Sequence, residues 1–145
     1  PAVNVGLSVS RVGGAAQTKA MKKAAGTIRI DLAQYREMEV FTQFSSDLDD
    51  ATKEQLQYGK GLMELLKQPL CHPMSLADQV ITLVTANNRL LLDVETKQTK
   101  DFQLRLLDFF HAEHKDIVDE LNNNKVLNEE LTKKIVAAVK EFKSR

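Results

Sequence analysis

Apolar residues recur at spacings of three and four along most of the chain, and this period limits the possible folds more than any other feature. One stretch begins at Ile28 and continues through Leu32, Tyr35 and Phe41. Further stretches with the helical period cover residues 54–67, 75–86, 95–121 and 129–142. The sequence therefore predicts an all-α protein, a helical bundle of about five to seven helices.

Side chains that favour helix starts precede several of these stretches. Ser75 and Asn128 stand where N-caps are expected, and Thr52 with Gln55 fits a capping box. The stretch 75–86 is too apolar for a surface helix, so we expect it to be the most buried one. The longest predicted helix spans residues 95–121.

Composition narrows the class of protein. The chain has 145 residues, enough for one ordinary domain, and its 20 basic and 20 acidic residues give no net charge. A nucleic-acid-binding domain usually needs a basic excess, and a membrane span needs about 20 apolar residues in a row. Neither feature is present, so we expect no nucleic acid and no direct membrane insertion. A single cysteine, Cys71, excludes an internal disulfide.

The first residues have a different period from the rest. Val3, Val5, Leu7 and Val9 alternate with small or polar residues, which predicts a strand that ends near Arg11. The glycine pair 13–14 permits a sharp turn, and residues 15–25 are strong helix formers. A lone cation between a strand and a helix can present its charge to a ligand, or it can simply be solvated.

Three carboxylates, Asp47, Asp49 and Asp50, lie close together in the sequence. They lack the spacing of a calcium-binding loop, and no glutamate follows at the offset that such a loop requires. Acidic residues directly before a helix are favoured by its dipole, so helix capping is the preferred interpretation.

Other residues with catalytic or metal-binding chemistry do not form a recognisable site. Cys71 and His72 are neighbours in the sequence, a position that rarely orients two side chains for proton transfer. His111 and His114 are three residues apart, but zinc needs further ligands from another segment. The chain contains no GxxxxGK[ST] phosphate-binding loop and no metal site is predicted.

The segment NVGLSVSRVGGAAQTKAMKKAAGTIRIDLAQYREMEVFTQFSSDLD resembles the alpha subunits of F-type ATP synthases. The resemblance is close over residues 1–66 and patchier beyond them. It implies that residues 1–17 end a nucleotide-binding α/β domain and that residues 18–145 form the C-terminal helical domain. We therefore expect an excised piece of a longer subunit, inactive alone, in which residues 1–12 have lost their sheet and are poorly ordered.

The resemblance also implies roles for individual residues. Arg11 matches the arginine finger that reaches the nucleotide on a neighbouring beta subunit. Gln68 matches one of two glutamines beside the adenine of a nucleotide bound to alpha, while Leu70 stands where the second is expected. Asp47, Asp49 and Asp50 match a turn that faces the central stalk.

The implied function is that of the regulatory alpha subunit in the rotary ATP synthase. Its implied partners are beta subunits, in an alternating hexamer, and the gamma stalk, through which ATP turnover is coupled to proton or sodium translocation. ATP or ADP with Mg²⁺ belongs to the full complex, and none is expected on this chain alone. The implied location is peripheral, on the cytoplasmic side of a bacterial membrane or the matrix or stroma side in an organelle.

Two other interpretations are compatible with parts of the sequence. Net neutrality, amphipathic helices and missing catalytic motifs also suit a stand-alone helical interaction module without enzymatic activity. The homologous beta subunit, or another subunit of a rotary ATPase, is the other alternative. Against it, the residues after Phe44 read SSDLDD and not DELSEED, and the SVSR sequence resembles alpha.

Overall fold

The computed structural model describes residues 3–5, 8, 10–42 and 48–145, without the side chains of 41 and 42. The described residues form eight α-helices and one short 3-10 helix, and the predicted all-α fold is confirmed. The helices are α1 (Arg11–Ala16), α2 (Lys19–Ala24), α3 (Ile28–Thr42), α4 (Asp50–Leu65), α5 (Leu76–Asn87), η1 (Thr96–Gln98), α6 (Thr99–Glu113), α7 (Lys115–Asn124) and α8 (Glu129–Lys143).

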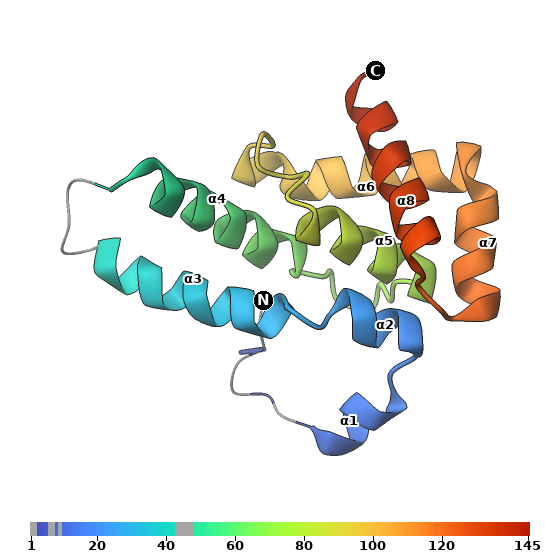
Figure 1. The fold of residues 1–145 in the computed structure, drawn as a ribbon, viewed down its shortest axis with the longest axis horizontal. Helices are drawn as coiled ribbons and strands as arrows, with labels where there is room; N and C mark the ends of the chain where they lie inside the picture. Colours follow the sequence, from blue (N-terminus) through green and yellow to red (C-terminus); the bar gives the residue numbers. More distant parts are fainter. Residues whose placement is uncertain (1–2, 6–7, 9, 43–47) are drawn as a thin grey trace.

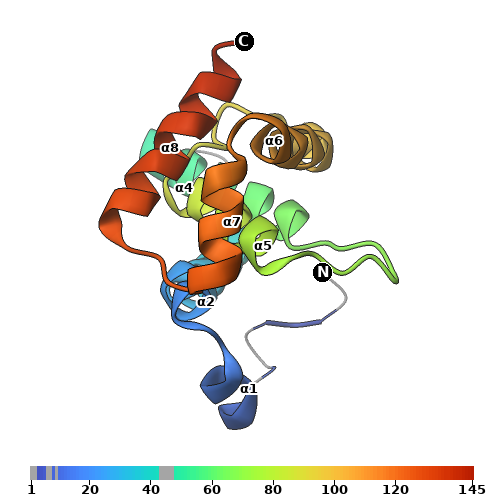
Figure 2. The same cartoon turned by 90° about the vertical axis from the view of Figure 1, so that its right-hand side faces the viewer.

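Helix α5 is the centre of the bundle. It contacts α2, α4, α6, α7 and α8, which surround it in both views (Figures 1 and 2). Its residues from Val80 to Ala86 are all buried, as the sequence predicted for this stretch. Because burial of a Val, Leu or Ile side chain is worth roughly 1.5–3 kcal/mol, this one helix anchors much of the core.

The predicted caps of α5 and α8 are confirmed, but that of α4 is wrong. Ser75 Oγ accepts a hydrogen bond from the Asp78 N–H at 3.1 Å, and Asn128 Oδ1 accepts one from the Leu131 N–H at 2.6 Å. Helix α4 is capped by Asp49, whose Oδ1 accepts from the Thr52 N–H at 3.0 Å. Thr52 is therefore inside the helix, because a better acceptor precedes it by three residues.

Two predicted helices are each divided in the structure. In place of one helix over residues 15–25, the chain forms α1 and α2, because Gln17 and Thr18 are extended and the Thr18 hydroxyl caps α2. In place of one helix over 95–121, α6 ends at Glu113, and His114 leaves the helical region with φ −124° and ψ 41°. Helix α7 then turns sharply away from α6 (Figure 1).

The strand predicted near the N-terminus is not formed by the residues described there. The Ser8 N–H donates to the Asn4 carbonyl oxygen at 2.9 Å, a turn contact that an extended strand cannot make. Leu7 and Val9 lie outside the described residues. A strand needs a neighbour to satisfy its backbone groups, and none of the described residues forms one.

Helices α3 and α4 form an antiparallel pair at one end of the bundle (Figure 1). Both tyrosines of the chain lie between the two helices, and each hydroxyl donates to a carboxylate of α3. Tyr35 Oη donates to Glu39 Oε1 at 2.8 Å, and Tyr58 Oη donates to Asp31 Oδ2 at 2.9 Å. The two helices are therefore packed around buried tyrosine rings whose hydroxyl groups are hydrogen-bonded.

These tyrosines provide an optical test of the α3–α4 packing. Burial, reinforced by the Glu39 carboxylate, raises the pKa of Tyr35 to about 12, and burial with the Asp31 carboxylate raises the pKa of Tyr58 further. We expect no phenolate absorbance near pH 10 in the folded chain, although both tyrosines should titrate there in denaturant.

The same shifts make stability depend on alkaline pH. Because the folded pKa values lie above the unfolded value of about 10, the tyrosine contribution is complete below pH 10. It should be lost as the pH rises from about 10 to about 12. A folded-state phenolate midpoint at about pH 10 would contradict this packing.

Candidate functional site

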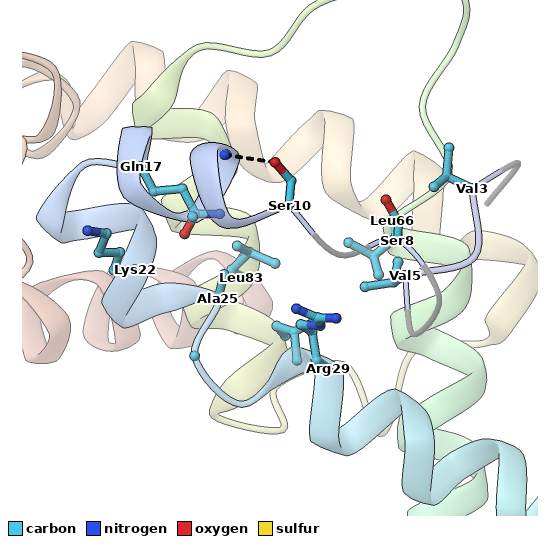
Figure 3. Close-up of a pocket in the computed structure, with 14 residues that line it drawn as sticks. Val3, Val5, Ser8, Ser10, Gln17, Lys22, Ala25, Arg29, Leu66 and Leu83 are labelled. Carbon is cyan, nitrogen blue, oxygen red and sulfur yellow. Dashed lines mark hydrogen bonds between the residues drawn. The ribbon is translucent and has the colours of Figure 1, made fainter.

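Arg11 is the first residue of α1 and lies on the exposed surface. Ser10 caps this helix through a 2.9 Å hydrogen bond from the Gly13 N–H to Ser10 Oγ, drawn in Figure 3. The Arg11 side chain is exposed and has no hydrogen bond or ion pair with any residue that the structure describes. A guanidinium that the described residues leave unpaired can offer its five N–H donors to an external anion.

A cavity of about 600 Å³ lies beside α1. Val3, Val5 and Ser8 of the N-terminal segment face Arg29 and Leu83 across it (Figure 3). Arg11 does not line this cavity. The cation predicted to be functional and the hollow near it are therefore separate features of the surface.

Gln68 lies in the loop between α4 and α5, which projects from the bundle in Figure 2. Its amide Nε2 donates to the His72 carbonyl oxygen at 2.5 Å, so the side chain braces its own loop and does not cap α4. Leu70, where the resemblance led us to expect a glutamine, is 90% exposed. A nucleobase placed against this loop would contact the apolar side chain of Leu70 where a glutamine amide was expected.

The acidic turn before α4 is used for capping in the part that the structure describes. Asp49 is the N-cap, and Asp50 begins the helix and contacts Lys53 at 3.0 Å. The hydrogen bond from Thr52 lowers the pKa of the Asp49 carboxyl. Asp47 lies outside the described residues. The Asp50 carboxylate is fully exposed despite its contact with Lys53, so a partner can still reach it.

The predicted site residues do not meet in one place. Asp49 and Gln68 lie beyond opposite ends of α4, and a helix of 16 residues separates them by about 24 Å. Arg11 is on α1, on another side of the bundle (Figure 1). If all three act, they act on different partners.

The histidines and the cysteine take structural or solvent-exposed positions. His111 Nε2 contacts Asp78 Oδ1 at 2.8 Å, whereas His114 packs on Phe109 and Phe110 and lies 3.5 Å from Glu141. Among the residues with described placement, no three His, Cys, Asp or Glu side chains gather as a metal site requires. Cys71 is exposed in a left-handed conformation with φ 61°.

One polar cluster was missed by reasoning from the sequence. Lys100 Nζ donates to the Leu65 carbonyl oxygen and to Gln103 Oε1, both at 2.8 Å, at the end of α4. Burial lowers the pKa of the Lys100 ammonium. No local sequence pattern marks this cluster, because Leu65 lies 35 positions before Lys100 in the chain.

Comparison with known proteins decides the family. Residues 17–142 match the model of the ATP synthase alpha/beta chain, C-terminal domain. The chain belongs to this family. Within it, the chain is 48% identical over 143 residues to the ATP synthase subunit alpha of Clostridium kluyveri. The alignment covers 99% of this chain and 28% of that subunit, so the similarity extends beyond residues 17–142 and includes Arg11.

Membership in the ATP synthase alpha/beta family agrees with the sequence-based assignment to alpha. The chain spans about 28% of the length of the curated relative that it matches. None of the helices in the described part of the chain combines the length and the apolar character needed to cross a bilayer.

Proposed function

We propose that this chain works inside an ATP synthase as the C-terminal domain of its alpha subunit. Family membership and the 48% identity to an alpha subunit support this assignment. ATP or ADP with Mg²⁺ would be bound in the full complex, whereas the chain alone would bind neither and perform no chemistry. It would act beside beta subunits and around the gamma stalk, peripheral to the membrane on its cytoplasmic side, or the matrix or stroma side in an organelle.

Arg11 is proposed to be the arginine finger. Its exposure, its lack of a partner among the described residues and its place at the start of a capped helix support this role. Hydrolysis and synthesis of ATP pass through a transition state whose charge spreads over the transferred phosphoryl oxygens. A guanidinium that reaches a nucleotide on the adjacent beta subunit would stabilise this charge only while the two subunits are closed on each other.

The helical domain is proposed to transmit motion between the stalk and the nucleotide sites. Asp49, Asp50 and Asp47 would meet the gamma subunit, and Gln68 would lie near the adenine of a nucleotide bound to alpha. The Leu70 position weakens base recognition from this loop, since a leucine offers no hydrogen bond. Through rotation of gamma, ATP turnover would be coupled to movement of protons or sodium ions.

A chimeric subunit tests this proposal. The matched 143-residue segment of the Clostridium kluyveri alpha subunit is replaced by this chain, and the subunit is assembled with its natural partners. We expect assembly and ATP hydrolysis within about tenfold of the unmodified complex, because the two segments are 48% identical and cores tolerate volume-conserving apolar substitutions. A chimera that folds but never enters the complex would favour a stand-alone interaction module.

A further inference from the structure

A second cavity, of about 650 Å³, opens between the loop that follows α4 and the outer face of α6. Its walls are mainly apolar and include Met74, Leu104 and Leu107. Leu104 is 63% exposed, although it is a large apolar side chain. The volume lies within the range of roughly 300–1,000 Å³ that is typical of small-molecule sites.

The floor of this cavity carries a cation without a matching anion. Lys100 is half-buried, and its two hydrogen-bond partners, a carbonyl oxygen and an amide oxygen, are neutral. No carboxylate of the described residues lies within ion-pair distance of Lys100 Nζ. Glu64 favours the charged lysine from further away, but Glu64 itself contacts Lys67. A third ammonium N–H thus remains available to a ligand.

Gln103 helps to hold the Lys100 ammonium in place. Gln103 is 5% exposed, donates to Thr82 Oγ1 at 3.2 Å and accepts from Lys100, and both residues line the groove with the apolar side chains. Two carboxylates also line the groove. The first, Asp78, is hydrogen-bonded to His111. The second is Asp108, and its negative charge would repel a ligand that carries several negative charges.

These features point to one class of ligand. We propose that this groove binds a small amphipathic anion, with one carboxylate or sulfonate on Lys100 and an apolar body against Leu104, Leu107 and Met74. The single unneutralised cation selects one negative charge, and the apolar walls select a hydrocarbon or aromatic body. This site is independent of the role proposed for Arg11.

Octanoate is a suitable probe, titrated into the 145-residue chain by calorimetry and by amide NMR. We expect saturable one-to-one binding with a Kd on the order of 1 mM or tighter, and shifts at residues 74, 104 and 107. Octanol, which lacks the charge, should bind at least about tenfold more weakly. Octanoate affinity should also fall as the pH rises, earlier than an ordinary lysine would cause, since burial lowers the pKa of Lys100.

Matched variants separate this site from general adsorption. Leu104→Glu places a carboxylate in the groove and should weaken octanoate binding at least about tenfold. Ile30→Glu makes the same charge change at a helix position of similar exposure, 60% against 63%, outside the groove, and should bind as the parent does. Lys100→Gln should also lose binding, whereas Lys100→Arg should keep it. Circular dichroism checks that each variant is folded. If Lys100→Gln does not fold, the comparison of Leu104→Glu with Ile30→Glu tests the proposal.

Three results would overturn the proposal. They are the absence of saturable octanoate binding, an equal loss in Leu104→Glu and Ile30→Glu, and equal affinities for octanoate and octanol. The proposal would also be overturned if the groove bound ATP but not octanoate and if Gln68→Ala abolished that ATP binding. The groove would then be part of the nucleotide contact proposed for the loop. With octanoate as ligand, Gln68→Ala should have little effect, because the Gln68 amide is used within its own loop.

Discussion

Replacing Arg11 with alanine in the assembled complex is expected to lower steady-state ATP hydrolysis by about two or more orders of magnitude, with nucleotide binding retained. The reason is that a finger supplied from a neighbouring subunit stabilises charge that develops only in the transition state. Binding of the ground-state nucleotide depends on other groups. The measurement is turnover together with nucleotide affinity on the same samples of the chimeric complex.

Two further variants make this result specific to Arg11. Arg11→Lys should recover only part of the activity, because an ammonium lacks the planar fork that matches phosphate oxygens. Lys19→Ala removes another exposed cation eight positions along the chain and should leave turnover unchanged. Turnover that is unchanged in Arg11→Ala would show that the role proposed for Arg11 is wrong.

Gly59→Ala is expected to destabilise the chain, whereas Gly61→Ala in the same helix should stabilise it or be neutral. A Cβ atom at Gly59 would lie 2.2 Å from Tyr35 Cδ2, 2.3 Å from Cγ and 2.6 Å from Cβ. These atoms lie close to the α3 backbone, so the two helices would have to separate. Overpacking of this kind costs about 1–3 kcal/mol or more, which outweighs the gain of about 1 kcal/mol in helix propensity.

Gly61 provides the matched comparison. A Cβ atom there meets nothing within 4 Å, so the propensity gain of up to about 1 kcal/mol is not opposed. Thermal and denaturant unfolding of both variants should therefore give shifts of opposite sign. If both glycines respond alike, the close approach of α3 and α4 at Tyr35 is wrong.

The helical period predicted the fold because most core residues are long apolar side chains at regular spacing. Ser75 and Asn128 were identifiable as caps, since each stands alone before its helix. At α4 the sequence offers Asp49 and Thr52 as competing caps, and only the backbone geometry decides between them. The division at His114 was not predictable, because Phe109, Phe110, Ile117 and Val118 keep the helical period on both sides of it.

Single residues could be chosen as candidates from the sequence. Features that arise from contacts between distant segments could not. Arg11 stands out as a lone cation in an almost uncharged stretch. The pairing of Lys100 with the end of α4 joins residues 35 positions apart, and no local pattern marks it. For the same reason no sequence pattern indicates that Gly59 faces Tyr35, since a glycine within a helix normally indicates only a local loss of helix stability.

The short helix α2 is joined by its backbone to the far end of the chain. The Ala20 N–H donates to the Lys125 carbonyl oxygen at 2.9 Å, and Asn87 Nδ2 donates to the Ala24 carbonyl oxygen at 2.7 Å. During synthesis on the ribosome, α2 emerges before either of these partners exists. The hydrogen bond from Ala20 must therefore wait until Lys125 has left the exit tunnel, so α2 is fully secured only after most of this chain has been made.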